Sequence, residues 1–97
     1  MTELLTETER KPLLEELEQS GWSYISETDS ITKSFKFKNF IEALGWIVEV
    51  GLISEKLNHH PEIHNVYNRV SITLTTHSAK GLTNLDFRLA KRIDRLR

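Results

Sequence analysis

Hydrophobic and polar positions divide the first half of the chain into a helix and two strands. Residues 6–20 carry apolar side chains at helical spacing, after a Thr6–Glu9 pair of the capping-box type. Residues 22–25 are short and aromatic, and residues 31–37 alternate between apolar and polar side chains, which is the period of a strand. The polar residues 27–30 between them have turn chemistry, so this half predicts a helix followed by a β-hairpin.

A long apolar segment, residues 40–57, predicts the central helix. Asn39 and Glu42 form a cap pair at its start, and residues 58–61 end it because the residue before Pro61 avoids the α region. Apolar side chains surround the axis of this segment. A helix of that kind is usually buried on more than one side.

The second half then repeats the hairpin and ends in a helix. Residues 65–67 and 70–76 predict two strands around a turn at Asn68-Arg69, and Thr83 with Asp86 forms a third cap pair before a final amphipathic helix. The element order α-β-β-α-β-β-α predicts an α+β fold, a four-stranded antiparallel sheet with three helices packed on one face.

Composition narrows the class of protein. The 97 residues suit one domain spanning residues 1–97, and 38% hydrophobic with 28% charged residues is typical of a soluble globular chain. A net charge of −1 gives no field that favours nucleic acid or an anionic membrane, and the lack of cysteine excludes disulfides and zinc–thiolate sites. The acidic start is no secretory signal, so we expect a cytoplasmic protein without a membrane span.

All four histidines fall between residues 59 and 77. Histidine has an ordinary pKa of about 6.5, so several imidazoles in one pocket transfer protons near neutral pH without a metal. His59 and His60 follow the central helix, and His77 follows the last predicted strand. Because that helix lies across the sheet, we expect these ends to meet. The plain alternative is that one or two of the histidines are ordinary surface residues.

A metal site is a weaker alternative. His60 and His64 lie four apart, a spacing that suits a metal only on a helix, and Pro61 argues against a helix that begins before it. The chain has no HExxH pattern and no evident carboxylate as a third ligand. The sequence therefore favours no metal, and His64 is expected on the surface.

Two carboxylates accompany the histidines. Glu55 lies one helical turn before His59 and is placed to orient that ring or raise its pKa, although a solvated helix face explains it equally well. Asp86 is explained without function as the third residue after the helix cap Thr83.

Taken together, the residues resemble a known family. The pattern Glu55-x-x-x-His59-His60-Pro61, followed at fixed spacing by Tyr67, His77 and Asp86, is similar to the signature of the pterin-4a-carbinolamine dehydratases. Similarity to that family extends over nearly the whole chain.

The resemblance implies an activity and a set of site residues. Family members dehydrate 4a-hydroxytetrahydropterin to quinonoid dihydropterin, which recycles the cofactor of aromatic amino-acid hydroxylases, and they need no metal or organic cofactor. By position, His59 and His77 match proton-transfer residues and His60 a pterin-binding residue. Glu55 and Pro61 match the substrate pocket, and Asp86 a supporting residue near His77.

The family also implies partners. Its members are dimers or tetramers, and the apolar helix of residues 40–57 suits such an interface. Some members stabilise the dimerisation domain of a transcription factor and others are assembly chaperones, so a non-catalytic interaction module is the alternative function. One departure stands out: many relatives have an aromatic residue shortly after the proline, where this chain has Ile63 and His64.

Overall fold

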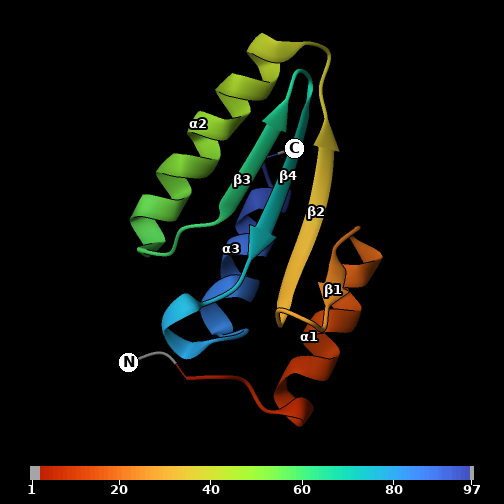
Figure 1. The fold of residues 1–97 in the computed structure, drawn as a ribbon, viewed down its shortest axis with the longest axis vertical. Helices are drawn as coiled ribbons and strands as arrows, with labels where there is room; N and C mark the ends of the chain where they lie inside the picture. Colours follow the sequence, from red (N-terminus) through yellow and green to blue (C-terminus); the bar gives the residue numbers. More distant parts are fainter. Residues whose placement is uncertain (1–2, 97) are drawn as a thin grey trace.

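A four-stranded antiparallel sheet with strand order β1-β2-β4-β3 is the centre of the fold, and three helices share a core on one of its faces (Figure 1). The computed structural model describes residues 3–96. The elements in chain order are α1 (Glu7–Gln19), β1 (Ser23–Ile25), β2 (Ser30–Lys36), α2 (Phe40–Leu57), β3 (Glu62–Val66), β4 (Arg69–Leu74), the 3₁₀ helix η1 (His77–Ala79) and α3 (Asn84–Asp94). The predicted α+β architecture and its element order are confirmed. None of the helices described is long and apolar enough to cross a membrane.

The two faces of the sheet differ as the alternation of the strands predicts. Val70, Ile72 and Leu74 of β4 are fully buried under the helices. The opposite face carries hydroxyl pairs between β2 and β4: Thr32 with Thr73 at 3.0 Å, and Ser34 with Ser71 at 3.1 Å. Only one face therefore contributes to the core, and the other is polar.

Helix α2 buries only one side within the single chain. Ala43, Trp46 and Val50 face the core, and the Trp46 ring packs on Phe35 with a centroid distance of 4.4 Å. On the other side Ile41, Val48 and Leu52 are exposed, with 62–72% of their surface accessible. The expectation that this helix is buried on more than one side is therefore wrong for the isolated chain.

The second hairpin begins earlier than predicted. Strand β3 starts at Glu62 rather than Asn65, and the turn is formed by Tyr67 and Asn68 rather than by Asn68 and Arg69. Tyr67 takes the left-handed conformation with φ 52°, which glycine or asparagine more often supplies. Asn68 is instead anchored to the end of β2, because its side-chain amide donates to the Phe37 carbonyl at 2.8 Å.

A clamp around Asp29 holds the segment before α3 against the first hairpin. Its carboxylate accepts from the Arg10 guanidinium at 2.6 Å, the Tyr24 hydroxyl at 2.7 Å and the Leu82 backbone N–H at 3.1 Å. The backbone carbonyl of Asp29 accepts from the Thr75 hydroxyl at 2.9 Å. One turn residue therefore ties α1, β1 and the η1 loop together.

Gly81 gives a first prediction. A Cβ at this position would overlap the Asp29 carboxylate and approach the Leu4 side chain to 2.7 Å. We expect Gly81→Ala to lower the free energy of unfolding by about 1–3 kcal/mol, measured by urea denaturation, because the clamp must open to admit the methyl group. Gly51→Ala is the control, since nothing lies within 4 Å of its added Cβ and alanine favours the helix. Equal destabilisation of the two variants would contradict this account.

Asp29 gives a second prediction, on pH. Burial raises its carboxyl pKa, but hydrogen bonds from Arg10, Tyr24 and Leu82 outweigh burial and leave the pKa below its ordinary value of 3.8. Because the Asp29 carboxyl has the higher pKa in the unfolded chain, the unfolded chain binds the proton more readily as the pH falls toward 4. The clamp therefore stabilises the fold above about pH 4, and this stabilisation is lost as the pH falls further. Asp29→Asn should therefore lower unfolding free energy more at pH 7 than at pH 3.

Glu15→Gln serves as the control for that measurement, because Glu15 is exposed on α1 and outside the clamp. Its effect on stability should be small at both pH values. An Asp29→Asn penalty that stays the same or grows toward pH 3 would refute the assignment of the clamp to an ionised carboxylate.

Candidate active site

The end of α2 directs His59 into the protein. Asn58 closes the helix in the left-handed conformation, with φ 53° and ψ 45°, and the backbone N–H of His59 donates to the Ser54 carbonyl at 3.0 Å. Pro61 then prevents the helix from continuing. This reversal turns His59 back toward the core, where only 8% of its surface remains exposed, while His60 stays exposed.

A fully buried carboxylate receives the His59 ring. Asp86, the third residue of α3, places Oδ1 2.5 Å from His59 Nε2. Its Oδ2 accepts from the Thr76 hydroxyl at 2.8 Å and from the Thr83 backbone N–H at 2.9 Å. The Thr76 and Thr83 hydroxyls are also 2.7 Å apart. Three elements, the ends of α2 and β4 and the start of α3, therefore meet at this one side chain.

This geometry determines which nitrogen of His59 is available for chemistry. When the Asp86 carboxylate is ionised it only accepts hydrogen bonds, and the hydrogen bond to His59 then requires a proton on Nε2. The other ring nitrogen, Nδ1, is left to accept or donate a proton. A buried carboxylate that fixes the tautomer and orientation of an imidazole is the arrangement found where histidine acts as a general acid or base.

His77 lies at the same end of the sheet. It follows Thr76 directly and begins η1, so its backbone is one residue away from a hydroxyl that contacts Asp86. Thr76 also forms a bridge with Gly81, which closes the η1 loop with backbone hydrogen bonds of 3.0 and 3.3 Å. The His77 side chain is exposed. The structure thus brings the His59 and His77 segments together through Thr76 and Asp86.

Glu55 orients a different ring from the one expected. Its carboxylate pairs with Nε2 of the exposed His60, and His59 is held by Asp86 instead. The expectation that Glu55 orients His59 is therefore wrong. The reason is the reversal after Leu57, which turns His59 inward and leaves His60 on the solvent side with Glu55.

Pro61 and Tyr67 also belong to the sequence pattern, and they lie at opposite ends of β3. Pro61 is half-buried between His60 and β3. Tyr67 lies at the opposite end of β3, where it forms the exposed hairpin turn, so five strand residues separate it from the histidine segment. Within one chain the structure therefore does not bring Tyr67 to the site.

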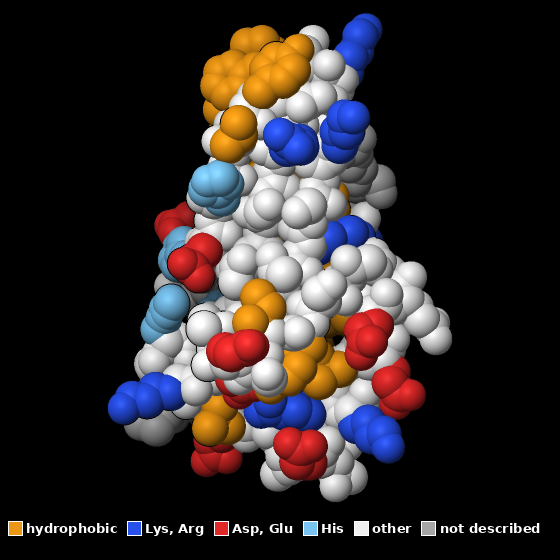
Figure 2. All heavy atoms as spheres, turned by 45° about the vertical axis from the view of Figure 1, so that its right-hand side comes forward, with side chains coloured by type: hydrophobic (Ala, Val, Ile, Leu, Met, Phe, Trp, Pro, Cys, Tyr) orange, Lys and Arg blue, Asp and Glu red, His pale blue; other side chains and the backbone are white. Residues whose placement is uncertain are grey.

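His64, the remaining histidine, also lies away from the Asp86 network. His64 lies on β3 opposite Ser71, in extended backbone, so its four-residue spacing from His60 is not a helical one. Within residues 3–96 no group of three or more histidine, aspartate and glutamate side chains is arranged to hold a metal ion. Figure 2 shows histidine side chains gathered on one flank of the molecule, next to acidic side chains.

Sequence analysis missed the two threonines of this network. Thr83 was identified only as a helix cap and Thr76 only as a strand residue, yet their hydroxyl groups and one amide complete the surroundings of Asp86. The sequence carried no signal for them, because the burial of Asp86, which requires several hydrogen-bond donors, is visible only in the structure.

Comparison with known proteins shows the family to which the chain belongs. A family model described as pterin 4 alpha carbinolamine dehydratase matches residues 3–96. A protein of Ruegeria pomeroyi is 48% identical over 96 residues, and one of Roseobacter denitrificans is 49% identical over 96 residues. The alignments cover 99% of this chain and 98–99% of each relative, and both relatives are provisionally named pterin-4-alpha-carbinolamine dehydratases.

Solved structures show the same fold. A transcriptional coactivator/pterin dehydratase from Brucella melitensis matches with a TM-score of 0.86 and 44% identity, over 95% of this chain and 96% of that one. A pterin dehydratase-like protein identified as a RuBisCO assembly factor in the alpha-carboxysome matches with a TM-score of 0.68 over 78% of this chain and 88% of that one. Its 23% identity supports the shared fold alone. By sequence and by structure, this chain belongs to the pterin 4 alpha carbinolamine dehydratase family.

Proposed function

We propose that the chain is a hydro-lyase that removes water from 4a-hydroxytetrahydropterin to give quinonoid dihydropterin. The single observation that carries this proposal is the buried His59–Asp86 pair, which leaves one imidazole nitrogen available beside the segment that bears His77. Membership of the family supplies the substrate class. The soluble composition suits action in the cytoplasm, alongside an aromatic amino-acid hydroxylase that regenerates the substrate.

The reaction requires one proton acceptor and one proton donor. The N5–H bond of the pterin breaks, the electron pair forms the N5–C4a double bond, and the C4a hydroxyl leaves as water once protonated. We assign these two transfers to His59 and His77, since imidazole acts as either acid or base near pH 7. His60, held by Glu55, is assigned to binding and positioning the pterin. The proposed mechanism uses no metal or organic cofactor.

The direct test is an activity assay. Purified protein is added to 4a-hydroxytetrahydropterin, and formation of the quinonoid product is followed by absorbance against the uncatalysed dehydration. Acceleration of product formation by the protein supports the proposal, and an unchanged rate at micromolar protein would refute it.

A second candidate function, a protein-interaction module, rests on the outer side of α2. Ile41, Val48 and Leu52 form a stripe at helical spacing, and exposed apolar patches on soluble proteins commonly mark interfaces. The Brucella melitensis structure is described as both coactivator and pterin dehydratase. We infer that this stripe joins copies of the chain into a homo-oligomer, and a different protein partner remains the alternative occupant. The stripe is separate from His59, so binding and catalysis are compatible.

The catalytic histidines give the third prediction. His59→Ala and His77→Ala should each slow turnover by about 10²–10⁴-fold, the usual size of a general acid–base contribution, in the absorbance assay. If one imidazole partly substitutes for the other, each single effect is smaller and the double variant loses much more. Asp86→Asn should slow turnover as well, because the amide no longer fixes the proton on His59 Nε2.

Two controls accompany these variants. His64→Ala should change the rate little, because His64 lies on β3 away from the Asp86 network. Treatment with a chelator should leave activity intact, whereas loss of activity and its recovery with zinc would favour a metal mechanism. Full activity in the His59/His77 double variant would rule out the proposed assignment.

The α2 stripe gives the fourth prediction. Val48→Asp places a charge at the centre of the stripe, so it should shift the protein toward monomer in sedimentation velocity, while the circular dichroism spectrum stays unchanged. Gln19→Asp adds the same charge on an exposed part of α1 and should leave the oligomeric state as it is. Wild-type protein that sediments as a monomer at high concentration would contradict self-association through α2.

A further inference from the structure

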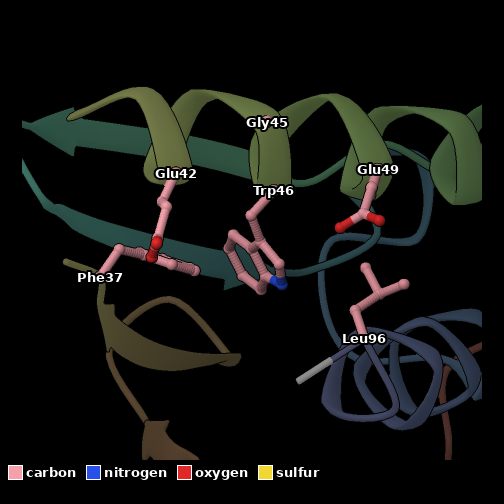
Figure 3. A pocket seen from close by; sticks show the side chains of 6 residues that line it. All are labelled: Phe37, Glu42, Gly45, Trp46, Glu49 and Leu96. Carbon is pink, nitrogen blue, oxygen red and sulfur yellow. The ribbon is translucent and has the colours of Figure 1, made fainter. Parts of the chain in front are cut away.

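A second site lies on the side of α2 that faces the end of α3. A cavity of about 460 Å³ opens there, between the first half of α2 and the residues that follow α3 (Figure 3). Its lining is Phe37, Glu42, Gly45, Trp46, Glu49 and Leu96. None of the histidines or their partners lines this cavity, so it is separate from the candidate active site.

The cavity contains a hydrogen-bond donor without a partner. Trp46 is only 4% exposed, and its indole Nε1 has no hydrogen-bond partner among the residues described. The other tryptophan is different, because Trp22 Nε1 donates to Asp94 at 3.0 Å. Figure 3 shows the Trp46 nitrogen on the side of the ring toward Glu49 and Leu96. A buried donor left unpaired is costly, and such groups are rare in folded proteins unless a ligand or water completes them.

The charges of the cavity point to a cation. Glu42 and Glu49 lie two turns apart on α2 and flank Trp46, and among residues 3–96 no basic side chain lines the cavity. One Glu42 oxygen accepts from the Lys38 backbone N–H at 3.3 Å, whereas Glu49 has no ion-pair partner within the described part of the chain. Both carboxylates are exposed and open to a ligand from solvent, while the Phe37 and Trp46 side chains form the apolar part of the lining.

The shape also suits a ligand of moderate size. A Cβ built on Gly45 meets nothing within 4 Å, so the floor of the cavity is open above the helix backbone. Glycine inside a helix costs about 1 kcal/mol relative to alanine, and no contact within this chain requires it here. Gly45 adjoins Ile41 and Val48 of the α2 stripe, and close approach of either a second copy or a ligand to the helix is a physical reason for a glycine there.

We propose that this cavity binds a cationic group that carries a neighbouring hydrogen-bond acceptor, as a basic amino-acid amide or a basic peptide does. Glu49, with Glu42, pairs with the cation, and the Trp46 indole N–H donates to the carbonyl of the ligand. The site is independent of pterin dehydration. A free small ligand and a side chain of a protein partner share this chemistry, and the test separates them.

The experiment follows the two indole N–H signals of the protein in ¹H–¹⁵N correlation spectra. N-acetylargininamide is titrated into the wild-type protein, and we expect a saturable downfield shift of the Trp46 signal alone. Trp22 serves as the internal reference because Asp94 already holds its indole N–H. N-acetylcitrullinamide, which keeps the shape without the charge, should bind at least about tenfold more weakly. Agmatine, which has the charge without the carbonyl, should bind without the downfield shift.

Variants locate the site. Glu49→Gln should weaken binding of N-acetylargininamide at least about tenfold, whereas Glu18→Gln, the same charge change on an exposed part of α1, should leave it unchanged. Both variants should dehydrate the pterin at the wild-type rate. If the peptide Gly-Arg-Gly binds much more tightly than N-acetylargininamide, the cation that the cavity binds is the side chain of a protein partner rather than a free small ligand.

Three results would overturn the proposal. The first is a Trp46 signal that does not move at millimolar N-acetylargininamide. The second is an equal shift of both indole signals, which would indicate a general solvent effect. The third is equal binding by the Glu49→Gln and Glu18→Gln variants. Because the readout is spectroscopic, none of these results depends on whether the chain is a dehydratase.

Discussion

The Asp86 carboxylate is the interaction on which the arrangement of this protein depends. It is fully buried, yet it receives hydrogen bonds from an imidazole, a hydroxyl and a backbone amide that belong to three different elements. A buried carboxylate is tolerated only when its surroundings satisfy its hydrogen-bonding groups, so the ends of α2 and β4 and the start of α3 must come together for the fold to be stable. The same requirement that positions these elements also fixes the orientation of the His59 ring. The stability of the fold and the proposed role of His59 therefore rest on the same contacts.

The fold was largely predictable because its signals are local. Alternation along β2 and β4 and the capping pairs at Thr6 and Thr83 specify elements without knowledge of their neighbours. The errors arose where contacts between residues distant in sequence determine the local structure. The turn at Tyr67 and Asn68 was placed one residue too late because the Asn68 side chain binds Phe37, which lies 31 residues away in sequence.

The candidate site also divides into features that local spacing predicted and contacts between distant residues that it did not. Its histidines were identified from spacing, and the family resemblance was correct, but the partner of each ring was not predictable from spacing alone. Glu55 lies one turn from His59 and nevertheless binds His60, while Asp86 binds His59 across 27 residues. Helix periodicity places neighbours on a regular helix, and it no longer applies once Asn58 turns the chain into the left-handed region. The Asp29 clamp was missed for a similar reason, since its partners come from α1, β1 and the η1 loop.

The bridge between Leu4 and Thr83 has a practical consequence for work on this protein. Leu4 pairs with the residue that caps α3, and the Leu5 N–H donates to the Leu82 carbonyl at 3.1 Å. The described part of the chain therefore begins beside the loop that bears His77, whereas α3 runs away from that loop toward its C-terminal end (Figure 1). A tag attached ahead of Leu4 would start close to that loop, so a cleavable or C-terminal tag is the sounder choice for testing the proposed activity.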